Sequence, residues 1–327
     1  HLLKKDCVGC HGGAGAATID GAGTPIVASA AMPSYPPDGS ASSALAGGNF
    51  YWVLADGTRG HNCLAIPGTA SDPALTLAPG YHGDQSACGV CHNYPMENNY
   101  LPGGMPPGAT APQDCEGCHL RISSCESCHR PAHHAPDGGP GPVGEAGGWY
   151  RFLISSYHPD PVLGVVGIED PDWEQTVSAA DHNEYNGASS PEGYPDHSLS
   201  HFCAGCHGDF HGNHNSLHGD GASPWIRHPT HIALPASGEY ALYNTADGAT
   251  PGPYDPMVPV ARDPGVLPGM AAASAQVTPG SDQVMCLSCH RAHGSPYPDA
   301  LRWDYDTCNA TVPNPDCGCF VCHTSKD

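Results

Sequence analysis

The chain has 327 residues, of which 33 are Asp or Glu and only 11 are Lys or Arg, so its formal net charge is −22 at pH 7. A chain this acidic excludes nucleic acid as a partner. Leu, Ile, Val and Phe supply 47 of the 327 residues, about 14%, whereas highly charged chains below roughly 20% do not fold without another source of buried surface.

The first predicted segment, residues 1–112, contains two copies of one cysteine pattern, at residues 7–11 and 88–92. Each copy has two cysteines three residues apart and a histidine directly after the second. Between the copies, residues 48–54 are aromatic and β-branched and lie between glycines, which predicts a strand. The Pro and Gly residues of positions 93–114 predict an irregular linker.

The second predicted segment, residues 113–327, contains five more copies of the pattern, two of them in tandem. These copies occupy residues 115–119, 125–129, 203–207, 286–290 and 319–323. The repeats have no fixed period, which argues against a solenoid.

Few regular elements are expected between these copies. Residues 149–154 predict a short strand or a turn, and Asp170 with Pro171 predicts the start of a short helix. The Gly and Pro residues of positions 136–148 and 254–280 predict further coil.

The repeated pattern has the spacing of a c-type haem attachment site, in which two thiols bond one porphyrin and the histidine ligates the iron. Zinc is the rival ligand of paired Cys-x-x-Cys motifs, but it does not require a histidine after the second cysteine in all seven copies. We therefore predict seven covalently attached haems c. The predicted attachment cysteines are Cys7, Cys10, Cys88, Cys91, Cys115, Cys118, Cys125, Cys128, Cys203, Cys206, Cys286, Cys289, Cys319 and Cys322. The predicted proximal iron ligands are His11, His92, His119, His129, His207, His290 and His323.

The tandem copies also indicate how close the haems lie. Six residue steps separate His119 from Cys125, a reach of about 20 Å at full extension and little more than the width of a porphyrin. Two haems anchored this way lie in or near contact, as electron transfer requires. The haems also supply the apolar surface that the side chains lack. The predicted fold is mostly irregular coil with few short helices and strands, scaffolded by a chain of seven haems.

The remaining histidines offer the second axial ligands. Seven of the 22 histidines are proximal, which leaves 15, and bis-His ligation of every iron would use seven of these. Position relative to a motif, an aromatic residue or a proline favours eight of them: His61, His82, His134, His158, His182, His211, His228 and His293. Position favours the others less: His1, His133, His197, His201, His214, His218 and His231.

Three cysteines lie outside the motifs. Cys308 and Cys317 are nine residues apart around two prolines, and this spacing favours a local disulfide in an oxidising compartment. Cys63 is then either a buried thiol or a link between molecules. Asn309 begins a glycosylation sequon, which is a weak signal alone.

The predicted location follows from the haem chemistry. Haem is attached to Cys-x-x-Cys-His outside the energised membrane, so we expect a secreted protein at the cell surface or beyond it, with the periplasm as the alternative. The absence of a leader at His1 and of any run of about 18 apolar residues predicts a mature chain without a membrane span.

Several blocks of the sequence resemble the paired Cys-x-x-Cys-His multihaem cytochromes of metal-reducing bacteria, and most of all the OmcE-type extracellular cytochromes that polymerise into electron-conducting filaments. The blocks are residues 60–62, 170–174, 181–185, 223–229, 259–262 and 286–295, so the resemblance covers mainly residues 115–327. It implies a coil-rich fold around a continuous row of bis-His haems. It also implies a homopolymer in which a histidine of one subunit ligates an iron of the next, with His1 and His61 as candidates.

Three functions are compatible with these features. The favoured one is a non-enzymatic electron conduit, with partner cytochromes or minerals as electron acceptors. A soluble periplasmic electron shuttle and a multihaem reductase are the alternatives. A reductase needs an iron with an open position, often marked by a lysine in place of the proximal histidine, and all seven motifs end in histidine.

Overall fold

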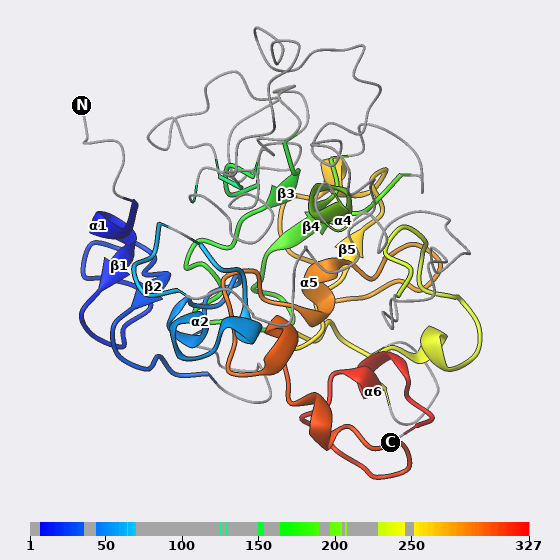
Figure 1. Ribbon diagram of the computed structural model, residues 1–327. Coiled ribbons are helices and arrows are strands. Elements are labelled where there is room, and N and C mark those ends of the chain that lie inside the picture. The colour runs from blue at the N-terminus through cyan, green and yellow to red at the C-terminus, as the bar shows by residue number, and fades with distance from the viewer. Residues whose placement is uncertain are drawn as a thin grey trace, which may run out of the picture.

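The computed structural model describes residues 7–35, 44–63, 65–69, 125, 128–129, 150–153, 164–189, 197–204, 207, 228–245 and 252–326. Within these ranges the chain is mostly irregular coil with short helices and strands (Figure 1). This confirms the predicted coil-rich fold. The predicted linkers at 93–114 and 136–148 lie outside the described residues.

The α-helices are short, and four of the five described ones carry a haem motif. They are α1 (Cys7–His11), α2 (Tyr51–Ala55), α4 (Leu199–Ala204), α5 (Cys286–Cys289) and α6 (Cys319–Cys322). The described 3-10 turns are η1 (Gly57–Arg59), η5 (Glu239–Leu242), η6 (Leu267–Gly269), η7 (Pro298–Ala300) and η8 (Tyr305–Thr307). Regular helix is therefore concentrated where the cysteine pairs lie.

Two small sheets are present in the described part of the chain. Strands β1 (Gly12–Gly13) and β2 (Ala28–Ser29) pair in parallel. Strand β4 (Glu184–Asn186) lies between β3 (Gly167–Ile168), which is antiparallel to it, and β5 (Ala261–Arg262), which is parallel. With two or three residues per strand, these sheets join distant segments without forming a layer.

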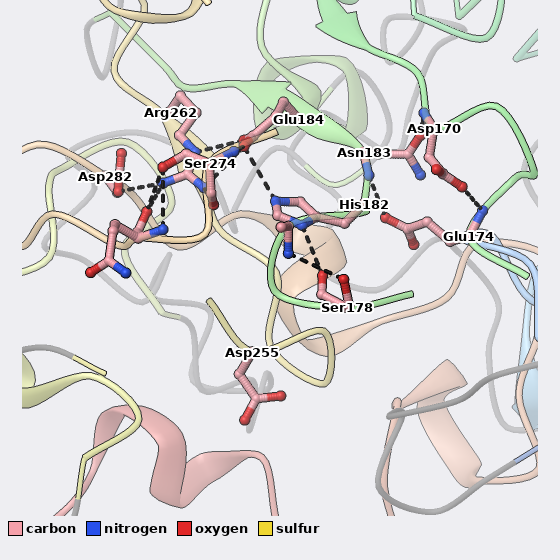
Figure 2. Close-up of polar contacts among 12 residues, drawn as sticks. Asp170, Glu174, Ser178, His182, Asn183, Glu184, Asp255, Arg262, Ser274 and Asp282 are labelled. Carbon is pink, nitrogen blue, oxygen red and sulfur yellow. Dashed lines mark hydrogen bonds and ion pairs between the residues drawn. The ribbon is translucent and has the colours of Figure 1, made fainter. Parts of the chain in front are cut away.

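A buried ionic network joins β4 to β5 (Figure 2). The guanidinium of Arg262 donates from Nε to Glu184 (2.6 Å) and from Nη1 to Asp282 (2.7 Å). Burial raises the pKa of Glu184, but hydrogen bonds from His182 and Arg262 outweigh burial and hold it below its usual value. The network thus fixes the sheet in a chain that is poor in aliphatic residues.

The apolar side chains form three small clusters, and motif cysteines pack against each of them. One cluster surrounds Tyr243, Tyr254 and Trp303, a second surrounds Tyr185 and Met285, and a third consists of Phe50, Val53, Cys63 and Ile66. Their partly buried neighbours include Cys289, Cys319 and Cys322 in the first, Cys128 and Cys203 in the second, and Cys125 in the third. The core therefore follows the haem motifs.

A segment from the first fifth of the sequence packs around α2 against a segment from its last eighth. The amide of Asn49 donates to the Gly294 carbonyl (3.0 Å), and the amide of His293 donates to the Gly47 carbonyl (2.7 Å). Gly48 has φ +80°, and a Cβ there would lie 2.0 Å from the Gly294 oxygen, so this approach requires glycine. Residues 44–63 and 291–295 thus form one packed region.

Two local predictions are wrong. Instead of the predicted strand at 48–54, the chain forms helix α2 at 51–55. The side chain of Asn49 accepts a hydrogen bond from the Tyr51 amide, which favours a turn there. Phe50 and Val53, three residues apart, then both pack into the core. Asp170 accepts from the Glu174 amide (2.6 Å) as a cap would, but positive φ angles at 173 and 174 (67° and 62°) end the turn before a helix forms.

Other local predictions are confirmed. Residues 150–153 form a turn, the second of the two predicted alternatives, and the segment from 254 to 280 is coil apart from β5 and η6. The predicted disulfide between Cys308 and Cys317 is present. Cys63 is 1% exposed, which favours the buried thiol over a link between molecules.

Candidate haem sites

The motif cysteines are presented by short helical turns. In α1, α5 and α6 the first and second cysteine lie three residues apart in one turn, so their side chains share a face of the helix. Each turn closes with a backbone hydrogen bond from the motif histidine, such as His290 to the Cys286 carbonyl (3.1 Å). Two thiols and one imidazole therefore project together, as attachment of one porphyrin requires.

Three proximal histidines have their Nδ1 atoms fixed by backbone carbonyls. Nδ1 of His11 donates to Pro25, that of His129 to Arg151 and that of His290 to Asp299, each at 2.8 Å. A carbonyl can only accept, so the proton resides on Nδ1 and Nε2 keeps its lone pair. Metal-ligating histidines are oriented in this way, and these three rings are ready to bind iron through Nε2.

Each of three proximal histidines also lies opposite a different predicted distal histidine. The ring centres of His129 and His293 are 6.0 Å apart, those of His207 and His61 are 6.0 Å apart, and those of His323 and His228 are 6.4 Å apart. Two imidazoles on opposite sides of one metal ion, with bonds of about 2 Å, have ring centres separated by about 6.3 Å. The three pairs therefore fit bis-His ligation of an iron held between them.

Burial keeps the distal rings neutral, as metal ligation requires. It lowers the pKa of His293 to about 3, and the neighbouring His129 lowers it further. It lowers the pKa of His61 to about 4, with His207 as the next cause. His61 Nδ1 donates to the Ala292 carbonyl (2.8 Å), so its Nε2 is also available for iron.

The five haem motifs of the described chain follow one another through the molecule. Cys125 of the 125–129 motif lies beside Cys63 and Cys7, which joins it to the first motif. Cys203 lies within hydrogen-bonding distance of Cys286. Burial and the neighbouring Cys319 raise the pKa of Cys289 to about 12, which places the last two motifs side by side.

The imidazole rings of His293 and His61 show which of the remaining sites are neighbours. His293 lies near both His129 and His61, so the 125–129 site adjoins the 203–207 site. His61 lies near His207 and His290, which links the 203–207 and 286–290 sites. The order along this path is 7–11, 125–129, 203–207, 286–290 and 319–323.

One favoured distal candidate is used differently. His182 is 3% exposed, stacks on Tyr254 (3.5 Å between ring centres) and has hydrogen bonds at both ring nitrogens, to Ser178 and Glu184. Among the described residues it faces no motif histidine, and Figure 2 shows it as part of the ionic network. The other favoured candidates, and the remaining motif residues, lie outside the described ranges: His82, His134, His158, His211, Cys88, Cys91, His92, Cys115, Cys118, His119 and Cys206.

His197 was not among the favoured candidates, yet it has the orientation of an iron ligand. Its Nδ1 donates to the Gly164 carbonyl at 2.9 Å, as in the proximal histidines. A sequence signal was available, because His197 lies six residues before Cys203, the same spacing that separates His82 from Cys88.

Two sequence comparisons relate the chain to known proteins. A family model described as the doubled CXXCH motif matches residues 278–327. The chain is 25% identical over 333 residues to the C-type cytochrome OmcS of Geobacter sulfurreducens, with 92% of this chain and 70% of the relative covered. In the described ranges no helix has the length and apolar character needed to cross a bilayer.

The fold is similar to that of two solved structures. The outer membrane cytochrome S filament from Geobacter sulfurreducens matches with a TM-score of 0.54 at 20% identity, covering 94% of this chain and 76% of that one. A cryo-EM structure of OmcS nanowires from the same organism matches with a TM-score of 0.50 at 20% identity, covering 97% and 81%. Together with the motif match, these similarities confirm the predicted resemblance to multihaem cytochromes of filaments.

Proposed function

We propose that the chain is a multihaem c-type cytochrome that conducts electrons through closely packed bis-His haems as a subunit of an extracellular filament. It carries seven haems c, one at each motif, and has no catalytic residues. The observation that carries this proposal is the facing of three motif histidines by predicted distal histidines at 6.0 to 6.4 Å. Two axial imidazoles leave an iron no open position for a substrate, which favours a conduit over a reductase.

The haems supply reversible one-electron chemistry at their irons, and the residues of this chain place and protect them. Helical turns orient the thiols, and backbone carbonyls orient the imidazoles. Burial lowers the pKa of His61 and His293, so both rings are neutral and able to bind iron. The row of adjoining sites from residues 7–11 to residues 319–323 supports conduction along the whole described chain.

We further propose that the two-haem segment 1–112 and the five-haem segment 113–327 are one continuous haem-wrapped unit. The support is the packing of residues 44–63 on residues 291–295. In particular, Arg291 donates to the Leu45 carbonyl (2.7 Å) and His61 to the Ala292 carbonyl (2.8 Å). The first segment thereby supplies the histidine that faces His207.

A filament of identical subunits needs electron entry and exit sites on surfaces that meet head to tail. Helix α1, with the first motif, and α6, with the last, lie on opposite sides of the molecule (Figure 1). His61 faces His207 within the chain, so of the two candidates for a ligand donated to the next subunit, His1 remains. Partner cytochromes or minerals beyond the cell are the acceptors in this proposal.

Electron microscopy of the purified holoprotein, together with low-temperature EPR, tests this function. We expect filaments and seven low-spin haem signals. A monomer at every concentration would instead indicate the soluble shuttle, and a high-spin signal would indicate a reductase with an open iron.

A further inference from the structure

Three sulfur atoms meet beside the C-terminal haem site. The Sγ atoms of Cys308, Cys317 and Cys319 all lie within 4.8 Å of one another. Cys308 and Cys317 are joined as a disulfide, whereas Cys319 is the first cysteine of the 319–323 motif and begins α6. The thiol that is to bond the porphyrin is therefore a direct neighbour of a disulfide.

The packing around these sulfurs holds them in place. Cys317 is 1% exposed and belongs to the cluster around Trp303. A Cβ on Gly318, which separates Cys317 from Cys319, would lie 2.4 Å from the Trp303 ring, so the ring covers this turn closely. Cys308 Sγ contacts the Asp304 carbonyl at 3.7 Å. Groups fixed at such distances react with a high effective concentration.

Three cysteines that share one disulfide have three possible pairings. If the thiolate of Cys319 attacks Cys317, a bond between Cys317 and Cys319 forms and Cys308 leaves as a thiolate, so the exchange gains and loses no electrons. Haem attachment is different, because the S–H of Cys319 adds across a vinyl double bond, with sulfur on one carbon and hydrogen on the other. The resulting thioether takes no part in thiol exchange.

We propose that the Cys308–Cys317 disulfide is a guard for haem attachment at residues 319–323. The disulfide joins Cys308 to Cys317, the two sulfurs that could otherwise form a disulfide with Cys319, and so leaves the Cys319 thiol available for haem. Attachment of haem then removes the Cys319 thiol, which could otherwise reopen the disulfide, so each modification protects the other. This inference rests on the proposed haem at this site.

The test compares single and double cysteine variants of the full chain, expressed with haem attachment. Cys317→Ser leaves the Cys308 thiol beside the Cys319 thiol. A disulfide-bonded oxidant of the compartment can then take two electrons and two protons from these two thiols, which forms a disulfide between Cys308 and Cys319. The double variant Cys308→Ser with Cys317→Ser removes the same native bond but leaves no competing thiol. Peptide mapping by mass spectrometry, after alkylation of free thiols, reports haem at each motif.

We expect Cys317→Ser to lower haem occupancy at 319–323 by roughly threefold or more and to yield a peptide cross-linked from Cys308 to Cys319. The double variant should regain wild-type occupancy, and the 286–290 motif should stay loaded in all chains as the internal reference. Equal occupancy in the single and double variants would overturn the guard. Wild-type chains without haem at 319–323 would instead refute the proposed haem site itself.

Discussion

Replacement of His293 by alanine tests the bis-His assignment at the 125–129 site. The ring centres of His293 and His129 are 6.0 Å apart, and about 1.1 Å from each centre to its nitrogen leaves about 3.8 Å, close to two metal bonds of about 2 Å. Loss of one imidazole from this pair leaves one iron of seven with an open position. We therefore expect about 14% of the low-spin haem signal to become high-spin.

The assay is EPR and visible absorption of the oxidised variant, with added imidazole as a rescue that restores the low-spin signal. His182→Ala is the matched control, because His182 is also buried but faces no motif histidine within the described chain. It should keep all seven low-spin signals and lose only stability. Seven low-spin signals in His293→Ala without imidazole would refute the assignment of His293.

Three further predictions concern stability. Gly48→Ala, with φ +80° and a Cβ 2.0 Å from a facing carbonyl oxygen, should destabilise the fold by about 1–3 kcal/mol in denaturant unfolding, whereas Gly21→Ala, with open space around it, should not. Arg262→Met removes the guanidinium that neutralises two buried carboxylates and should cost about 3–5 kcal/mol in the same assay. Arg59→Met, which breaks a partly exposed pair, should cost less than about 1 kcal/mol. Burial and iron ligation both favour a neutral His61 ring, so its pKa in the folded protein lies below the usual 6.5. The unfolded chain therefore binds this proton first, and stability should fall as pH falls below about 6.5. Unfolding free energies that are equal at pH 7 and pH 4 would contradict this.

Covalent haem c could be predicted from the sequence because the attachment chemistry fixes both residue type and spacing. The same holds for the coil, since the scarcity of aliphatic residues and the abundance of Gly and Pro leave few regular elements. The disulfide was predictable because Cys308 and Cys317 are close in sequence and the haem motifs predict an oxidising compartment.

The rest depended on contacts that are distant in sequence. The aromatic run at 48–54 has strand propensity, but Asn49 and the approach of Gly294 turn it into a helix. The facing of His61 and His207 spans 146 positions, and no local pattern encodes it. His182 has aromatic neighbours like other favoured candidates, and its stacking on Tyr254 and its hydrogen bond to the Glu184 carboxylate give it a structural role.

The central claim is that seven haems provide both the core of this protein and its path for electrons. The mass of the intact purified chain tests this claim most directly, because each covalent haem adds a fixed increment to the polypeptide. The account predicts one dominant species with seven haem additions. A dominant species with fewer than seven, in a chain that is nevertheless folded, would contradict it.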